Sequence, residues 1–261
     1  ERLVAEHPSP STVLRVRDLH KSFVLHAIDG RRIEALRGIE LDLHAGEHVA
    51  LVGSSGAGKS TLLKSIYRTY LPDAGEVWLH RQGCEPVDLL ALDDRSLATL
   101  RVREIGYVSQ FLRAEPRRGV LDAVTRAGIR RGLGAVDAAD AARHILEHLG
   151  IGEKLWHTFP TLLSGGEKQR VNLAAGIICP PPVLLLDEPV SALDPANRDA
   201  VLALIAELTG QGTSVLAVFH DLDAIERLAH RVIRLDRGHV AAVGSPADIL
   251  AELSASIGAP R

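Results

Sequence analysis

The chain has 261 residues, of which 46% are hydrophobic and 24% are charged. This length and this apolar content are enough for one large α/β domain or two small ones around a real core. The formal net charge of −3 gives no bulk electrostatic reason to bind nucleic acid or an anionic membrane.

The two cysteines, Cys84 and Cys179, lie far apart with no metal-ligand spacing. This number and spacing of cysteines argue against a disulfide framework and a zinc ribbon, and they favour a cytoplasmic protein. The longest apolar runs, such as "VLLL" and "SVLAVF", are too short to span a bilayer. We therefore expect no direct membrane insertion, and any work at the inner face of a membrane would occur by docking.

The N-terminal part of the chain predicts a flexible lead and then an antiparallel sheet. Residues 1–12 contain prolines and serines that neither continue a helix nor pair in a sheet. The segments "VLRVRDLHKSFV" and "IEALRGIELDLHAGE" alternate apolar with polar residues, as strands of a half-exposed antiparallel sheet do. Asp29-Gly30, between them, is a typical hairpin turn.

Three further segments predict strands that are buried on both faces. "HVALV", "PVLLLDEP" and "TSVLAVFHD" each contain a short apolar run, which is followed by glycine or by polar residues. In α/β sheets, ligands bind at the carboxyl ends of such strands. These three strand ends are therefore the candidate active edge.

The middle of the chain predicts helices, because "DLLALDDRSLATLRVREIG" and "DAADAARHILEHLGI" carry alanine, arginine and leucine at helical spacing. We predict a single α/β domain over residues 13–261. Its nucleotide-binding core comprises residues 13–86 and 170–261, and residues 87–169 form a helical subdomain insertion. The chain closes with the predicted helix "SPADILAELSASI".

The segment "GSSGAGKST" fits the phosphate-binding pattern G-x-x-x-x-G-K-[ST] and stands between a buried strand and a helix-forming run. Its glycines let the backbone approach a phosphate closely, while loop N–H groups point at the anion. We expect Lys59 to reach the β- and γ-phosphates of a nucleotide and Ser60 to bind Mg²⁺. The expected loop residues are Gly53, Ser54, Ser55, Gly56, Ala57, Gly58, Lys59, Ser60 and Thr61.

The alternative for this segment is a glycine-rich turn whose lysine merely happens to stand at a helix start. A cation at that position opposes the helix dipole unless an anion is bound there. The strand–loop–helix context therefore favours the phosphate site.

Asp187 and Glu188 stand at the end of the buried strand "VLLLD". One carboxylate at such a position can hold the shell of Mg²⁺ while the next polarises a water molecule. We assign Asp187 to the metal and Glu188 to the attacking water as the general base. By itself, "DEP" is equally consistent with a plain exit from a strand into a turn.

His220 follows the third buried strand, and Gln110 follows the strand-like "IGYVS". We expect His220 to contact a γ-phosphate as a donor, and Gln110 to sense the metal and the water from the start of the helical region. A lone histidine at a strand end is more often structural, and a lone glutamine is ordinarily solvated. The case for both residues depends on the neighbouring phosphate loop.

The segment "LSGGE" places two adjacent glycines where a helix begins. Ser164 and Glu167 fit a capping box, in which each side chain satisfies a backbone donor of the other residue. The box does not explain Gly165 and Gly166, because each glycine destabilises a helix by roughly 1 kcal/mol relative to alanine. A helix N-terminus without side chains is an anion site, and that predicts a second phosphate contact.

Together, these segments resemble the ATP-binding subunits of the ABC family. "GSSGAGKST" is similar to the Walker A loop, "LSGGE" to the family signature, "VLLLDE" to Walker B and "SALD" (Ser191–Asp194) to the D-loop. Gln110 is similar to the Q-loop residue and His220 to the switch histidine. The resemblance implies a P-loop NTPase core of ABC type, with an antiparallel β subdomain, a helical subdomain and hydrolysis of ATP with Mg²⁺.

The resemblance also implies a head-to-tail dimer with a second ABC subunit. The signature residues would then face the nucleotide of the partner, and Phe23 would stack on adenine. The alternative for Phe23 is a core phenylalanine on a strand. The signature residues concerned are Ser164, Gly165, Gly166 and Glu167.

Several strings, among them "STLLKSIYRTYLPDAGEV" and "LWHTFPTLLSGGEKQRVNLAAGII", resemble the L-type ATP-binding subunit of the phosphonate carbon–phosphorus lyase system. That resemblance implies soluble phosphonate lyase subunits as partners. The segment between Phe23 and Gly53 also resembles ATPases of lipoprotein-release and macrolide-export transporters, which implies a membrane permease instead. A third possibility is a non-hydrolytic module that binds ATP only to assemble a complex.

Overall fold

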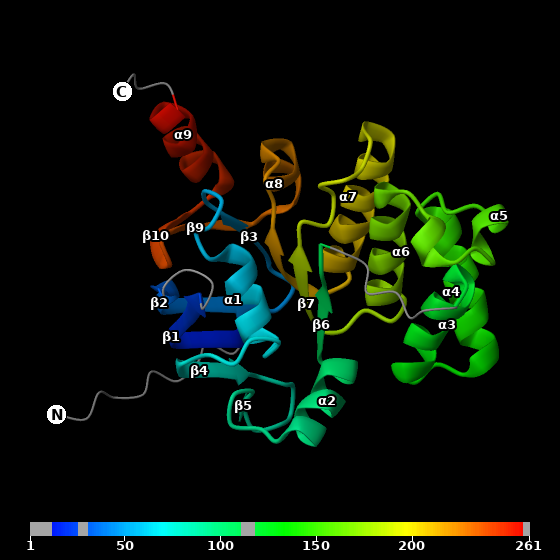
Figure 1. Ribbon diagram of the computed structural model, residues 1–261, viewed down its shortest axis with the longest axis horizontal. Coiled ribbons are helices and arrows are strands. Elements are labelled where there is room, and N and C mark those ends of the chain that lie inside the picture. The colour runs from blue at the N-terminus through cyan, green and yellow to red at the C-terminus, as the bar shows by residue number, and fades with distance from the viewer. Residues whose placement is uncertain (1–11, 26–30, 111–117, 258–261) are drawn as a thin grey trace.

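The computed structural model describes residues 12–25, 31–110 and 118–257 (Figure 1). The strands in these residues are β1 (Thr12–Leu25), β2 (Arg31–His44), β3 (His48–Val52), β4 (Ala74–Leu79), β5 (Val87–Asp88), β6 (Ile105–Val108), β7 (Val183–Asp187), β8 (Ser214–Val218), β9 (Arg231–Asp236) and β10 (His239–Gly244). The α-helices are α1 (Lys59–Ile66), α2 (Asp94–Arg103), α3 (Val120–Arg130), α4 (Ala135–His148), α5 (Glu153–Trp156), α6 (Gly165–Ile177), α7 (Pro195–Gly210), α8 (Leu222–Leu228) and α9 (Pro246–Ile257), and η1 (Pro160–Leu162) is a 3₁₀ turn.

The three predicted buried strands are neighbours in a six-stranded sheet of order β10-β9-β3-β8-β7-β6. β3, β8 and β7 run parallel to one another, with Ala50 opposite Ala217 and Leu185 opposite Leu216. Every residue of these three strands is buried, as predicted. Because the strands are parallel, their carboxyl ends meet at one edge of the sheet.

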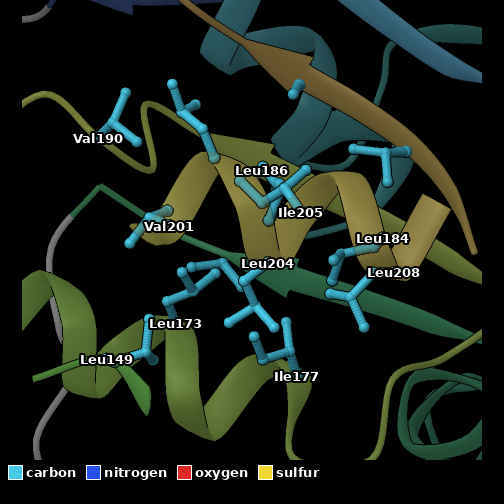
Figure 2. Close-up of a cluster of buried hydrophobic side chains, with 14 of the residues drawn as sticks. Leu149, Leu173, Ile177, Leu184, Leu186, Val190, Val201, Leu204, Ile205 and Leu208 are labelled. Atoms are coloured by element: carbon cyan, nitrogen blue, oxygen red, sulfur yellow. The ribbon is translucent and has the colours of Figure 1, made fainter. Parts of the chain in front are cut away.

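The six-stranded sheet separates two hydrophobic cores. Along β7, Leu184 and Leu186 belong to one core, while Val183 and Leu185 belong to the other. The first core is closed by α6 and α7. Ile205 of α7 packs near Leu186 of β7 (Figure 2). The second core lies under α1 and the four-stranded sheet. Burial on both faces explains why these strands are continuous apolar runs.

The four-stranded sheet has the order β2-β1-β4-β5 and is antiparallel. In β1, Leu14 and Val16 are fully buried, whereas Arg15 and Arg17 point the other way and form ion pairs with Asp42 of β2. The predicted alternation is therefore confirmed. The expected turn at residues 29–30 and residues 1–11 of the expected lead over 1–12 lie outside the described residues, and Thr12 already belongs to β1.

Helices α3, α4 and α5 gather beside α6, on the side away from the four-stranded sheet (Figure 1). β6 lies inside residues 87–169, yet it pairs in parallel with β7, with Tyr107 opposite Leu185. β6 is thus a strand of the parallel sheet, and we propose that the helical subdomain begins after it. No helix in the described residues combines the length and the apolar character needed to cross a bilayer.

Candidate active site

The phosphate loop connects β3 to α1 and needs glycine at two positions. Gly53 has φ 143° and Gly58 has φ 106°, both in the left-handed region. A Cβ atom would stand 2.2 Å from the carbonyl oxygen of Leu235 at Gly53, and 2.5 Å from that of Ala35 at Gly58. α1 then begins without a side-chain cap and without an acidic residue in its first turn. The helix therefore leaves N–H groups available for an anion.

Lys59 is buried in this loop and is only 6% exposed. Its Nζ donates to the carbonyl oxygens of Gly53 at 2.7 Å and Ser54 at 2.9 Å. Burial lowers the pKa of the Lys59 ammonium, and the carboxylates of Glu188 and Asp187 act in the opposite direction. An ammonium in this position gains stabilisation from an added anion, so the loop fits a nucleotide phosphate.

Asp187 lies at the end of β7, directly beside the start of α1. Ser60 Oγ donates to Asp187 Oδ1 at 2.7 Å, and the Tyr107 hydroxyl donates to Asp187 Oδ2 at 3.0 Å. Asp187 is 3% exposed, so the protein holds this carboxylate in one orientation. A hydroxyl and a carboxylate are oxygen ligands of the kind that Mg²⁺ prefers. The pair therefore fits the predicted metal site.

Glu188 is held from two sides by side chains from the segments that follow β6 and β8. Gln110 Nε2 donates to Glu188 Oε2 at 2.8 Å, and His220 Nε2 lies 2.8 Å from Glu188 Oε1. The structure thus brings together three residues that were assigned separately from the sequence. Glu188 also has φ 54°, which is unusual for a residue with a side chain and is seen where a site requires a specific orientation.

A cavity of about 180 Å³ lies at this edge of the sheet. It joins the phosphate loop to the carboxylate of Glu188 and the ring of His220, so the expected phosphate-binding and water-activating groups face one space. Its lining residues are Ala35, Ser55, Gly56, Gly58, Lys59, Ser60, Thr61, Glu188 and His220.

Phe23 lies on β1 and is not part of that lining. Its ring makes an edge contact with Tyr70, with centroids 5.2 Å apart, and the Lys21 ammonium stands 5.2 Å from the ring centroid. The ring is half-buried rather than enclosed in a core. Adenine stacking on Phe23 remains a prediction.

The signature segment, Leu163–Glu167, begins α6. Ser164 Oγ accepts from the Glu167 N–H, and Glu167 Oε2 accepts from the Ser164 N–H at 2.7 Å, which confirms the capping box. The two glycines differ. A Cβ at Gly165 would meet no atom within 4 Å, whereas a Cβ at Gly166 would stand 3.0 Å from the carbonyl oxygen of Ala192. Packing within the chain therefore explains the glycine at 166 but not the glycine at 165.

Two residues of the site were not predicted from the sequence. Tyr107 binds Asp187, as described above. Gln169, 2% exposed on α6, donates through Nε2 to the carbonyl oxygen of Glu188 and accepts the Ala192 N–H at 3.0 Å. The available signal for Gln169 was its place in "SGGEKQR", five residues after the helix cap.

Comparison with known proteins identifies the family. The ABC transporter family profile matches residues 36–191, which is more than half of the chain. This chain belongs to the ABC transporter family. It is an ATP-binding cassette, it uses ATP with Mg²⁺, and its activity is that of an ATPase.

Named relatives resemble this cassette over most of its length. The lipoprotein-releasing system ATP-binding protein LolD of Myxococcus xanthus is 38% identical, over 87% of this chain and 98% of its own. LolD of Saccharophagus degradans is 36% identical, over 80% and 89%. The methionine import ATP-binding protein MetN of Thermobifida fusca is 36% identical, over 89% and 70%.

Solved structures show the same fold. The dimeric ATP-binding cassette MJ0796, described as bound to ADP and Pi after hydrolysis, has a TM-score of 0.81 and 28% identity, over 89% of this chain and 98% of its own. The ABC-type α/β fold predicted from the sequence is therefore confirmed. The narrower phosphonate resemblance has no support in these names, because the relatives are named for lipoprotein release and methionine import.

Proposed function

We propose that this cassette hydrolyses ATP as a head-to-tail dimer, with Glu188 as the general base. The observation that carries the proposal is the placement of the Glu188 carboxylate between Gln110 and His220, beside the phosphate loop. A carboxylate fixed in this way can accept a proton from a water molecule that attacks the γ-phosphate. Both of its oxygens are oriented by neighbours, so the geometry is set before substrate arrives.

The other loop residues have separate tasks in this proposal. Lys59 and the N–H groups at the start of α1 hold the phosphates, while Ser60 and Asp187 hold Mg²⁺. When bound, Mg²⁺ neutralises charge on the β- and γ-phosphate oxygens. His220 contacts the γ-phosphate, and Phe23 stacks on adenine. Gln110 reports on whether the metal and water are in place.

The substitution Glu188→Gln tests the general base. The amide keeps the shape of the side chain but accepts no proton, so we expect the turnover rate to fall about 100-fold or more. ATP affinity is expected to remain unchanged, because the phosphate loop is intact. Glu207→Gln, an exposed change on α7, is the matched control. Wild-type turnover by the Glu188→Gln protein would remove Glu188 from the role of general base.

We further propose that the cassette is the motor of a membrane permease rather than a partner of soluble phosphonate lyase subunits. The lipoprotein-release resemblance and the names of the relatives favour this reading. A groove of about 350 Å³ between β6 and α3 offers a surface for a cytoplasmic helix of the permease. Tyr67 and Tyr107, with ring centroids 5.3 Å apart, line it together with Arg126 and Arg130. Tyrosine and arginine are enriched at protein interfaces.

Site-specific photocrosslinking in native cells tests the partner. A benzoylphenylalanine at Ala123, which lines the groove, is compared with one at the exposed Ala251 on α9. We expect an integral membrane protein to be crosslinked from position 123 and not from position 251. Crosslinking to soluble phosphonate enzymes would replace the permease reading, and equal labelling from both positions would contradict docking in the groove.

A further inference from the structure

A cluster of ion pairs joins the first turns of α7 to α8. Arg198 Nη2 binds the carboxylates of Asp221 and, at 2.6 Å, Asp223. Arg227 of α8 binds Asp199 at 2.6 Å and Asp223 at 3.5 Å. The Arg198 side chain is 23% exposed and that of Arg227 is 41% exposed. Arg198 is therefore the more buried of the two cations, and the pairs that it forms are screened less by solvent.

The acceptor of Arg198 stands next to a residue of the active site. Asp221 follows His220 directly and caps α8 by accepting the Asp223 N–H at 3.0 Å. Arg198, Glu188 and His220 also line one cavity of about 340 Å³. The Arg198–Asp221 pair thus fixes the segment that carries the His220 ring, and this ring lies 2.8 Å from the Glu188 carboxylate.

The residue before Arg198 holds a different element. Asn197 Oδ1 accepts a hydrogen bond from Arg170 of α6, the helix that the signature segment begins. Asp194 caps α7 by accepting the Asn197 N–H at 3.1 Å. Consecutive residues on one turn of α7 therefore hold α6 on one side and the His220 segment on the other.

From this geometry we propose that Arg198 is a positioning residue for ATP hydrolysis, acting through Asp221 on His220. Arg198 itself does not line the cavity of the phosphate loop. When α6 shifts and α7 moves with it, Arg198 moves as well. Arg198 then displaces the His220 segment relative to Glu188. The signature segment at the start of α6 is thereby linked, through one turn of α7, to the edge of the sheet that carries Glu188 and His220. The inference rests on the proposed roles of Glu188 and His220.

Steady-state ATPase kinetics of purified protein test this inference. Arg198→Ala is expected to lower kcat about tenfold, because a charge-assisted contact that orients a reacting group is lost. KM for ATP is expected to stay within about twofold, since Arg198 lies outside the lining of the phosphate-loop cavity. Arg198→Lys is expected to restore part of kcat. Arg227→Ala, in the same cluster but without contact to Asp221, is the matched control and is expected to keep wild-type kcat.

A double-mutant comparison separates positioning from a general stabilising effect. His220→Ala is expected to lower kcat, and adding Arg198→Ala to it is expected to cause no further loss. Equal losses in Arg198→Ala and Arg227→Ala, or additive losses with His220→Ala, would overturn the inference. Wild-type kcat in His220→Ala would instead contradict the proposed function. If Arg198→Ala fails to fold, Asp221→Asn keeps the helix cap while weakening the ion pair, and it is expected to show the same pattern.

Discussion

Glu188 shows how individual residues set the chemistry of this cassette. Its backbone is in the left-handed region, and its carboxylate is shared between Gln110 and His220. Backbone strain at a residue with a side chain costs on the order of 1–3 kcal/mol and persists only where the surroundings impose it. Here Gln169 donates to the Glu188 carbonyl oxygen, and the Glu188 N–H donates to the carbonyl oxygen of Val218 at 3.2 Å, so both backbone groups of this residue are held. The side chain is thereby directed at the phosphate loop rather than along the strand.

His48, at the start of β3, is a residue that the proposed activity does not use. It is 0% exposed, and neither ring nitrogen has a hydrogen-bond partner among the described residues. Burial, and to a smaller extent the charge of His230, lowers the pKa of His48 to about 3. In the unfolded chain the pKa returns to about 6.5. The unfolded state therefore binds the proton more readily, and stability is lost as pH falls from about 6.5 towards 3.

Replacing His48 with leucine tests this residue. Between about pH 7 and pH 5 the wild type is expected to lose about 2 kcal/mol of unfolding free energy to this one group, and His48→Leu to lose correspondingly less. Urea unfolding at both pH values measures the difference. His148→Leu, an exposed change on α4, is the control and is expected to follow the wild type. Parallel losses in wild type and His48→Leu would show that the buried ring does not govern the acid response.

Helix α6 shows how one element serves both the fold and the site. Its capping box satisfies the first backbone donors, and its Gln169 and Arg170 reach Glu188 and Asn197. Gly166 allows the helix to approach Ala192, so it has a packing reason inside the chain. Gly165 faces open space, so no contact within the described residues accounts for its lack of a side chain.

The elements that could be predicted from the sequence are those whose pattern is local. β3, β7 and β8 were recognisable because both faces are buried, and the capping box because its two residues are three apart. Gly53 and Gly58 were recognisable through the phosphate-loop spacing.

Contacts between distant segments were not predictable in this way. Tyr107 meets Asp187 across 80 residues, and only the order of strands in the sheet places it there. The same limit applies to β6, which was expected inside a helical subdomain. β6 is a short edge strand, and its membership of the sheet depends on pairing with β7 rather than on its own pattern. Arg198 and Asp221 belong to the same class of long-range contact.

At the scale of the whole molecule, the phosphate loop and the signature segment do not share a cavity. The loop of Lys59 and the carboxylate of Glu188 share one cavity, and the signature residues are absent from its lining. A single chain therefore offers the cavity of the phosphate loop and, apart from it, the exposed start of α6. A head-to-tail dimer would join them, and MJ0796, a cassette of the same fold, is described as dimeric.

The central claim is that the signature segment completes the ATP site of a second subunit. The most direct measurement is the mass of the Glu188→Gln protein by light scattering with Mg-ATP, with and without Gly165→Asp. Gly165 faces open space, so the aspartate is expected to fold normally and to leave ATP affinity within about twofold, while its charge repels the partner's phosphates. Gly210→Asp, also in open space but at the far end of α7, is the matched control.

The account predicts a dimer for Glu188→Gln and for Glu188→Gln with Gly210→Asp, and an ATP-bound monomer for Glu188→Gln with Gly165→Asp. A dimer in the presence of Gly165→Asp, or loss of ATP binding by that monomer, would contradict it.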